Sequence, residues 1–347
     1  MTVYIILWAI VIIACFIETN FKYLKFGRFK IIAKNPCFFT IYIYSLLIGI
    51  MRNELHGVDS ISYQGLYYYK GNSPIISIML DFVSDNGYYF LGKIVHDIGV
   101  DFWGFRAILY IITFSIFAHV IYKESKNVSI SFLCYFGIGF LVLDFCILRQ
   151  AAACSICFYA FRYLKEKEKV KFVFLVLLAA TFHKTAIFYL VLLALTSDKV
   201  KKLSIVKKIV LVLGAVLVGQ FILPLMYQFY SNDYSNLSIK GEGEMLLIAY
   251  AFLILAMGYY YKKNKDSSMQ IEYDTLFTSI YAQIIALFFS LFTRVTNYFA
   301  MMFTLVIPDF VMKRKDRNVY LLIIIFVFSI LYYLGIQGAD MVPYMTQ

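Results

Sequence analysis

The sequence is dominated by long apolar runs that short basic segments interrupt. Several runs approach or exceed the roughly 20 residues that a helix needs to cross a bilayer. Hydrophobic residues make up 62% of the chain and charged residues 15%, whereas about a quarter of an ordinary soluble domain is charged. The runs are spread along the whole chain and leave no room for a separate soluble domain. We therefore expect an all-α polytopic integral membrane protein in which residues 1–347 form a single transmembrane domain.

About ten runs are predicted to be full membrane spans. Basic residues orient them, because 24 of the 32 Lys and Arg residues lie in six segments that share one side if the chain starts outside. The positive-inside rule assigns this side to the cytoplasm and both termini to the outside. The net charge of +11 then reflects topology and attraction to anionic lipids, and no nucleic-acid partner is expected. The predicted spans are residues 2–20, 37–51, 103–122, 128–148, 150–164, 207–229, 245–261, 275–292, 295–312 and 319–337, and the basic segments are residues 21–36, 123–127, 162–171, 199–208, 262–265 and 313–317.

A further apolar run, residues 172–197, is interrupted near its middle by His183 and Lys184. Basic segments flank it on both sides, so one crossing would place one of them on the wrong side of the membrane. The run is predicted to enter and return as a pair of short re-entrant helices, each too short to span a bilayer at 1.5 Å per residue. Broken backbone at membrane depth is tolerated only inside protein or beside a water-filled cavity. The turn is therefore a candidate site.

Two longer loops are predicted on the outer side. Residues 52–102 are rich in Tyr and Asp and contain two apolar stretches, 75–83 and 88–98. Both stretches are too short to span, so we expect interfacial or re-entrant helices there. Residues 231–244 are polar and contain Gly, which predicts a surface loop.

Several polar residues at the outer ends of the spans come from distant parts of the chain. Ionisable groups in or near hydrocarbon are costly and usually mark a pathway or a site. Arg matches phosphate oxygens with a planar donor fork, and a neutral His can accept a hydroxyl proton near neutral pH. The pattern predicts a site for an anionic lipid head, although each residue can also be read as a helix-end or packing residue. The candidates are Arg52, Asp59, Arg149, Gln150, His183, Lys184 and Arg294; Asp144 is open between a buried pair, a polar helix contact and a catalytic role.

Nucleotide, serine-hydrolase and zinc-site motifs do not occur in the sequence. We therefore expect neither a metal nor a cofactor. The candidate residues instead point to chemistry that Arg, His and Asp side chains perform by themselves.

Four stretches, in order, resemble elements of the EpsG-like family of bacterial polysaccharide polymerases, which are similar to Wzy-type polymerases. LRQAAACSICFYAFRYLKEKEKVKFVFLVLLAATFHKTAIFYL combines an Arg-Gln pair, a small-residue helix, a basic loop and Leu-Ala-x-x-Phe-His. RNELHGVDSISY resembles an Arg…Gly-x-Asp…Tyr element and adds Tyr63, and RVTNYFAMMFTLVIPDF resembles an Arg…Tyr-Phe…Pro element and adds Tyr298. SDNGYYFL resembles a Glu-Pro-Gly-aromatic element, except that Asp85 and Asn86 replace Glu-Pro.

The resemblance implies a metal-independent, GT-C-like glycosyltransferase of the bacterial inner membrane. Such an enzyme joins undecaprenyl-diphosphate-linked oligosaccharide repeat units on the outer, periplasmic face. The implied partners are these lipid-linked glycans and membrane lipids, with a chain-length regulator as an open question. We expect cations to stabilise the departing diphosphate and a base to take the acceptor proton. The expected catalytic residues are His183, Asp59 and Arg149, and the expected diphosphate-binding or sugar-binding residues are Arg52, Arg294, Gln150, Lys184, Tyr63 and Tyr298.

Two other functions are weighed against polymerisation. A flippase or transporter of lipid-linked glycans is expected to carry inverted repeats and charges through the bilayer midplane. This sequence shows no internal repeat, and its candidate charges gather at one face. An O-antigen ligase or a transferase that uses a polyprenyl-phosphate sugar stays open, because the sequence separates these enzymes poorly.

Overall fold

The fold is taken from a computed structural model that describes residues 1–26, 29–53, 57, 59–80, 85–196, 244–287, 291–339, 341–342 and 344. The chain divides into two compact units. Unit 1 comprises Met1–Ile187 and Met301–Gln347, and unit 2 comprises Phe188–Ala300. The predicted span 207–229 and almost all of the predicted outer loop 231–244 lie outside the described residues.

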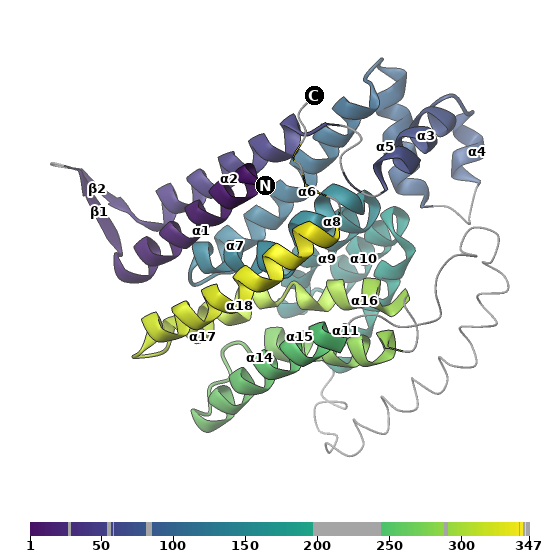
Figure 1. The fold of residues 1–347 in the computed structure, drawn as a ribbon. Helices are drawn as coiled ribbons and strands as arrows, with labels where there is room; N and C mark the ends of the chain where they lie inside the picture. The colour runs from purple at the N-terminus through teal and green to yellow at the C-terminus, as the bar shows by residue number, and fades with distance from the viewer. Residues whose placement is uncertain are drawn as a thin grey trace. The chain divides into compact units, whose positions relative to one another are not determined.

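Unit 1 is built of helices and carries a two-stranded antiparallel hairpin in which Tyr23 pairs with Ile32. Figure 1 shows this hairpin at one end of the unit and the short helices α3–α5 at the other. The elements are α1 (Thr2–Asn20), β1 (Tyr23–Phe26), β2 (Phe29–Ile32), α2 (Lys34–Met51), α3 (Ser60–Gly71), α4 (Ile75–Met79), α5 (Asn86–Asp97), α6 (Phe102–Glu124), α7 (Val128–Gly137), α8 (Phe140–Cys146), α9 (Leu148–Lys165), α10 (Lys169–Phe182), α17 (Phe303–Met312) and α18 (Arg317–Gly338).

Polar side chains set where α6 and α7 begin. Asp101 caps α6 by accepting the Gly104 amide at 2.8 Å, and Asn127 caps α7 by accepting the Ile130 amide at 3.0 Å. The Glu18 carboxylate, near the end of α1, also accepts the Val128 amide at 3.0 Å. These contacts satisfy amides that have no partner within their own helix. They also tie α1 to the start of α7.

The described residues contain five segments that are long and apolar enough to cross a membrane, whereas about ten spans are predicted from the whole chain. A sixth is added if α7 and α8 count as one span. These two helices meet at a bend of 57°, where Gly139 adopts a left-handed conformation with φ 91°. The run predicted as one straight span over 128–148 is therefore broken, because glycine adopts this conformation without the strain that a Cβ would add. The five segments are Thr2–Asn20, Lys34–Met51, Phe102–Glu124, Phe292–Met312 and Arg317–Gly338.

The predicted outer loop 52–102 folds into α3, α4 and α5, which share a small apolar core with the start of α6 and of α9. Phe102 and Phe105 of α6 are fully buried in this core. The Tyr67 phenol donates to the Val100 carbonyl at 2.6 Å. The apolar stretches 75–83 and 88–98 predict helices α4 and α5. Helix α3 is not predicted, because its residues are more polar. Whether these helices lie at a membrane interface stays a prediction.

Unit 2 contains α11 (Val191–Leu195), α14 (Glu244–Lys263), α15 (Gln270–Ala286) and α16 (Leu291–Ala300), and the 3₁₀ helix Lys184–Leu190 leads into it from unit 1. α15 packs against both α14 and α16. The Tyr273 phenol of α15 donates to the Ile254 carbonyl of α14 at 3.1 Å.

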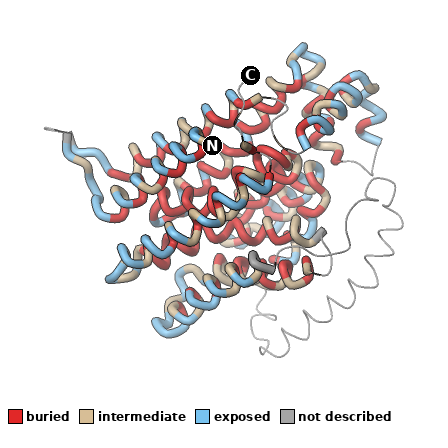
Figure 2. The backbone as a smooth tube through the Cα atoms, in the orientation of Figure 1, coloured by how far each residue is buried: buried red, intermediate tan, exposed pale blue. Residues whose placement is uncertain are grey.

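Burial follows the apolar pattern within each unit. Figure 2 shows that α7 and α9 are buried along most of their length, whereas one face of α18 and the β hairpin are exposed. Exposed apolar residues such as Phe326 on α18, with 68% of its surface accessible, fit helices that meet lipid instead of water.

Candidate functional site

Helices α9 and α10 form a hairpin that brings two candidate residues to one level. Their connection turns at Lys167, which adopts a left-handed conformation with φ 63°. α9 has 18 residues and α10 has 14, so each helix covers roughly 20–27 Å at 1.5 Å per residue. Arg149 at the start of α9 and His183 directly after α10 therefore lie at the same end of the hairpin.

Small side chains let the two helices pack closely. Ala152 and Ala153 of α9 and Ala179 of α10 are all buried. Small residues reduce the distance between helix axes without leaving voids. The small residues of α9 therefore allow the close helix packing that holds Arg149, at the start of α9, near the end of α10.

Asp85, at the N-terminus of α5, joins Arg149 and His183 into a cluster. Its Oδ2 atom lies 2.8 Å from Arg149 Nη1 and 3.4 Å from His183 Nδ1. Its Oδ1 atom accepts the Lys184 amide at 3.3 Å. The side chains of Asp85 and His183 are 8% and 6% exposed, and that of Arg149 is 23% exposed. A charge-assisted hydrogen bond at such a largely buried position contributes about 1.5–3 kcal/mol to the free energy of unfolding.

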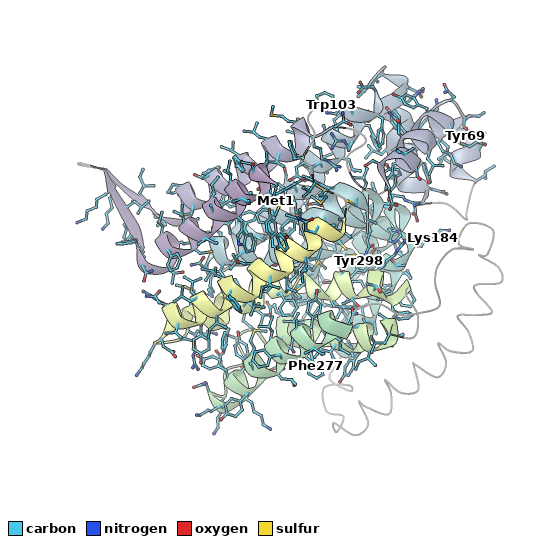
Figure 3. The ribbon with its side chains drawn as sticks, in the orientation of Figure 1. Met1, Tyr69, Trp103, Lys184, Phe277 and Tyr298 are labelled. Atoms are coloured by element: carbon cyan, nitrogen blue, oxygen red, sulfur yellow. The ribbon has the colours of Figure 1, made fainter. Side chains whose placement is uncertain are left out.

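His183 occupies a break in the backbone. α10 ends at Phe182, and His183 is extended, with φ −156° and ψ 117°. The break falls at the position where the sequence predicts a turn, while the re-entrant path through a membrane stays a prediction. Lys184, labelled in Figure 3, follows directly at the end of the α9–α10 hairpin.

Glycine at position 87 allows α5 to start against the end of α10. A Cβ atom at this position would lie 2.2 Å from Thr181 Oγ1 and 3.1 Å from the Thr181 carbonyl carbon. The backbone of Gly87 is not in the left-handed region, so the requirement is one of space alone. This close approach holds Asp85, two residues earlier, against His183.

Tyrosine rings line the approach to Arg149. Its guanidinium carbon lies 5.5 Å from the centre of the Tyr63 ring and 5.9 Å from that of Tyr89, within the range of cation–π attraction. Tyr88 packs against Tyr63 with ring centres 5.8 Å apart. Burial raises the pKa of the Tyr88 phenol well above its usual value, so Tyr88 stays neutral. Tyr63 is predicted from the sequence, and its neighbours Tyr88 and Tyr89 are not.

Arg52 is fully buried beside the end of α8 and not within the Asp85 cluster. Its Nη1 atom donates to the Phe145 carbonyl at 2.8 Å, and its guanidinium lies 4.2 Å from the Phe145 ring. Arg106 donates to the Arg52 carbonyl in turn. These contacts tie the end of α2 to α6 and α8.

Asp59 and Gln150 occupy different environments. Asp59 is exposed before α3, where its carbonyl accepts the Tyr63 amide at 3.0 Å. Gln150 is fully buried on α9. Asp144, the other carboxylate considered from sequence, accepts a hydrogen bond from Tyr135 and is buried. Among the carboxylates in the described residues, Asp85 is the one that pairs with Arg149.

Arg294 and Tyr298 belong to α16 in unit 2. Arg294 is half-buried, and Tyr298 is fully buried with its ring centre 6.4 Å from that of Tyr189. Their role in binding a diphosphate or a sugar stays a prediction. Pro308, from the same sequence element, lies inside α17.

The cluster combines a carboxylate, a guanidinium and an imidazole in a nearly dry place. A carboxylate on Nδ1 fixes the tautomer of a neutral imidazole and leaves Nε2 as the proton acceptor. The guanidinium can hold a phosphate oxygen. Base chemistry beside anion binding is therefore possible here. In the described part of the chain, no group of three His, Cys, Asp or Glu residues is arranged to hold a metal ion.

Arg149 and His183 are predicted from the sequence, and Asp85 is not. The signal was visible, since SDNGYYFL matches the family element with Asp85 at the place of a Glu. A shorter carboxylate keeps the charge, and the structure places it where Arg149 and His183 meet.

Comparison with known proteins supports the resemblance. A family model, that of the EpsG family, matches residues 34–346. No curated protein and no solved structure matches the chain. A match to this family suggests a role as a glycosyltransferase-like polysaccharide polymerase. The apolar helices agree with a multi-pass membrane protein. The chain belongs to the EpsG family.

Proposed function

We propose that the protein polymerises undecaprenyl-diphosphate-linked oligosaccharide repeat units at the outer face of the bacterial inner membrane. The growing glycan on its diphosphate lipid is the donor, and a single lipid-linked repeat is the acceptor. A GT-C-like architecture, an outer site and outer termini are parts of this proposal. So is catalysis without a metal, with arginines supplying the positive charge.

The proposed reaction exchanges one bond at the anomeric carbon. The bond from this carbon to the diphosphate oxygen breaks, and a bond to the acceptor hydroxyl oxygen forms. The hydroxyl proton passes to His183 Nε2, while Asp85 orients the ring and balances the imidazolium charge. The lipid diphosphate leaves with an added negative charge, which Arg149 stabilises. Arg52, Arg294, Gln150, Lys184, Tyr63 and Tyr298 stay candidates for holding diphosphate or sugar, and Asp59 stays an alternative base.

The Asp85–Arg149–His183 cluster is the observation that carries the proposal. Its members come from α5, α9 and the break after α10, and Asp85 lies within 3.4 Å of both partners. Packing alone does not require a carboxylate, a guanidinium and an imidazole to meet in a place this dry, where each is costly to desolvate. Such groups cluster at functional sites.

Substitutions in a polymerase-deficient strain test the proposal. We expect Arg149→Ala, His183→Ala and Asp85→Asn each to leave a single repeat unit in place of a ladder of glycan lengths. Asp97→Asn is the matched control for Asp85, because Asp97 lies on the same helix, is exposed and pairs with Lys93 at 2.5 Å. Immunoblots of the membrane fraction check that the variants accumulate equally. A normal ladder from the three cluster variants would refute the site.

The lipid-linked products separate the proposed function from its alternatives. Loss of a polymerase leaves single repeats on the outer face. Loss of a ligase instead leaves long lipid-linked chains, and loss of a flippase leaves repeats on the cytoplasmic face. Lipid extraction with a membrane-impermeant glycan label distinguishes the three outcomes. Either of the last two would contradict polymerisation.

A further inference from the structure

A hollow lies between α6, α9 and α17, at the end of unit 1 that carries the basic segments 123–127 and 162–171. It encloses about 280 Å³. Arg149 and Arg162 lie near opposite ends of the 18-residue helix α9, so roughly 20 Å of helix separates the hollow from the Asp85 cluster. It is therefore a separate feature from the proposed active site.

Positively charged side chains stand at the rim of the hollow. Lys123 lies in the last turn of α6, and Arg162 and Lys165 lie in the last turn of α9. The rim also carries Glu124, Glu166 and His119. With His119 neutral, the rim has one net positive charge.

Lys123 and Arg162 are the rim cations that lie outside the ion pair of Lys165 with Glu124. Lys165 lies 3.0 Å from Glu124 and neutralises it. The Arg162 guanidinium stacks 4.4 Å from the Tyr159 ring centre, and its Nη2 atom donates to the Tyr163 hydroxyl at 2.7 Å. Both of these partners are uncharged and fix the orientation of the guanidinium, while the nearby Glu166 carboxylate offsets part of its positive charge. A planar guanidinium held in this way suits a phosphate group.

The floor of the hollow is apolar. Phe158 and Phe161 of α9 and Leu305 of α17 are buried and line it together with Val120 of α6. A free phosphate ion gains nothing from such a floor. A phospholipid gains contact for the first carbons of its acyl chains while its head group meets the charged rim.

We propose that this hollow binds the head group of an anionic phospholipid. Basic pockets between membrane helices recognise such head groups through phosphate contacts and the local positive potential. The volume, below the range of about 300–1,000 Å³ for drug-sized ligands, suits a head group and not a whole glycan. The site is independent of glycan transfer, so it stands or falls separately from the proposed function.

Lipid binding to the purified full chain tests this site. Native mass spectrometry in detergent measures binding of phosphatidylglycerol and of phosphatidylcholine, with inorganic phosphate as a soluble competitor. We expect phosphatidylglycerol to bind preferentially and millimolar inorganic phosphate not to displace it. Lys123→Gln combined with Arg162→Gln is expected to weaken this binding roughly tenfold or more, since each cation contributes to lipid attraction.

A second double variant provides the matched control. Lys126→Gln with Lys169→Gln removes two exposed cations that lie nearby in the sequence. Neither of these two side chains lines the hollow. Lys123→Glu alone, at an exposed position, gives a further test that spares the packed Arg162. Equal binding of the two lipids, or equal loss in both double variants, would overturn the proposal. Displacement by inorganic phosphate would show a soluble-phosphate site and would overturn the lipid assignment.

Discussion

A methyl group at position 87 tests the geometry of the Asp85 cluster. In Gly87→Ala the new Cβ would lie 2.2 Å from Thr181 Oγ1, whereas ordinary contact begins at 3.4 Å, so 1.2 Å has to be absorbed. Rotation of the Thr181 side chain cannot absorb all of it, because the Thr181 carbonyl carbon is only 3.1 Å away. The start of α5 must therefore move and carry Asp85 with it.

The displacement acts on a contact with little margin. Asp85 Oδ2 is already 3.4 Å from His183 Nδ1, so even the few tenths of an ångström that the Thr181 backbone contact demands break this hydrogen bond. Misplacing a catalytic group by about 1 Å costs on the order of 100-fold in rate, and a shift of a few tenths of an ångström is expected to cost on the order of tenfold. We expect a loss of that size in the initial rate of glycan-ladder formation, measured with purified protein in lipid nanodiscs.

Two further variants separate geometry from folding. Gly65→Ala places a methyl group on the neighbouring helix α3, where no atom lies within 4 Å, and is expected to keep the wild-type rate. Thr181→Gly combined with Gly87→Ala removes the two atoms closest to the new methyl group. The rate of this double variant is expected to be roughly tenfold higher than that of Gly87→Ala alone, because substitutions at two residues in contact are not additive. A wild-type rate in Gly87→Ala would refute the reasoning. So would a double variant that folds but shows no recovery.

Three other predictions follow from particular contacts. Tyr135→Phe removes the donor to Asp144 and is expected to lower the free energy of unfolding by about 1–3 kcal/mol, seen as earlier thermal denaturation with an unchanged rate per folded molecule; an unchanged denaturation curve would contradict it. Tyr69→Cys on exposed α3 is expected to react with an impermeant maleimide from outside and Lys167→Cys only after permeabilisation, with little background because all six native cysteines are buried; labelling of both from one side would contradict the topology. Burial raises the pKa of Tyr67 to about 12. The neutral phenol therefore stabilises the folded helices fully below the ordinary tyrosine pKa of about 10, and this stabilisation is lost as the pH rises through about 12. Protease resistance of α3–α5 is expected to fall over this pH range in the wild type and to fall less in Tyr67→Phe.

The main helices were predictable because lipid imposes a strong and local rule. A run such as 2–20 or 319–337 has to form a helix in hydrocarbon, since no water is present to satisfy its backbone. The corresponding helices, Thr2–Asn20 and Arg317–Gly338, begin and end within two residues of those limits. The 57° bend between α7 and α8 was not predictable in the same way. A single Gly inside an apolar run can continue the helix or bend it, and the sequence alone does not show which backbone conformation it adopts.

The candidate site was predictable in part. Arg149 and His183 are conspicuous because each interrupts or borders an apolar run. Asp85 lies in a polar loop segment, where a carboxylate does not interrupt an apolar run, and Asp59 is the carboxylate that the sequence predicts instead. The choice between them depends on how α5 packs on α10 through Gly87 and Thr181. That is a contact between segments almost a hundred residues apart.

The sequence by itself determined that the chain is a multi-pass membrane protein of apolar helices, that α10 breaks at His183, and that Arg149 and His183 are functional candidates. These features follow from hydropathy, from charge placement and from a polar pair within an apolar run, all of which are local. Only the tertiary structure decided that Asp85 joins Arg149 and His183, and that Arg52 is held by the Phe145 carbonyl instead. The physical reason is that a charged group in a dry interior takes its properties from the partners within a few ångströms, and those partners are chosen by packing between distant helices.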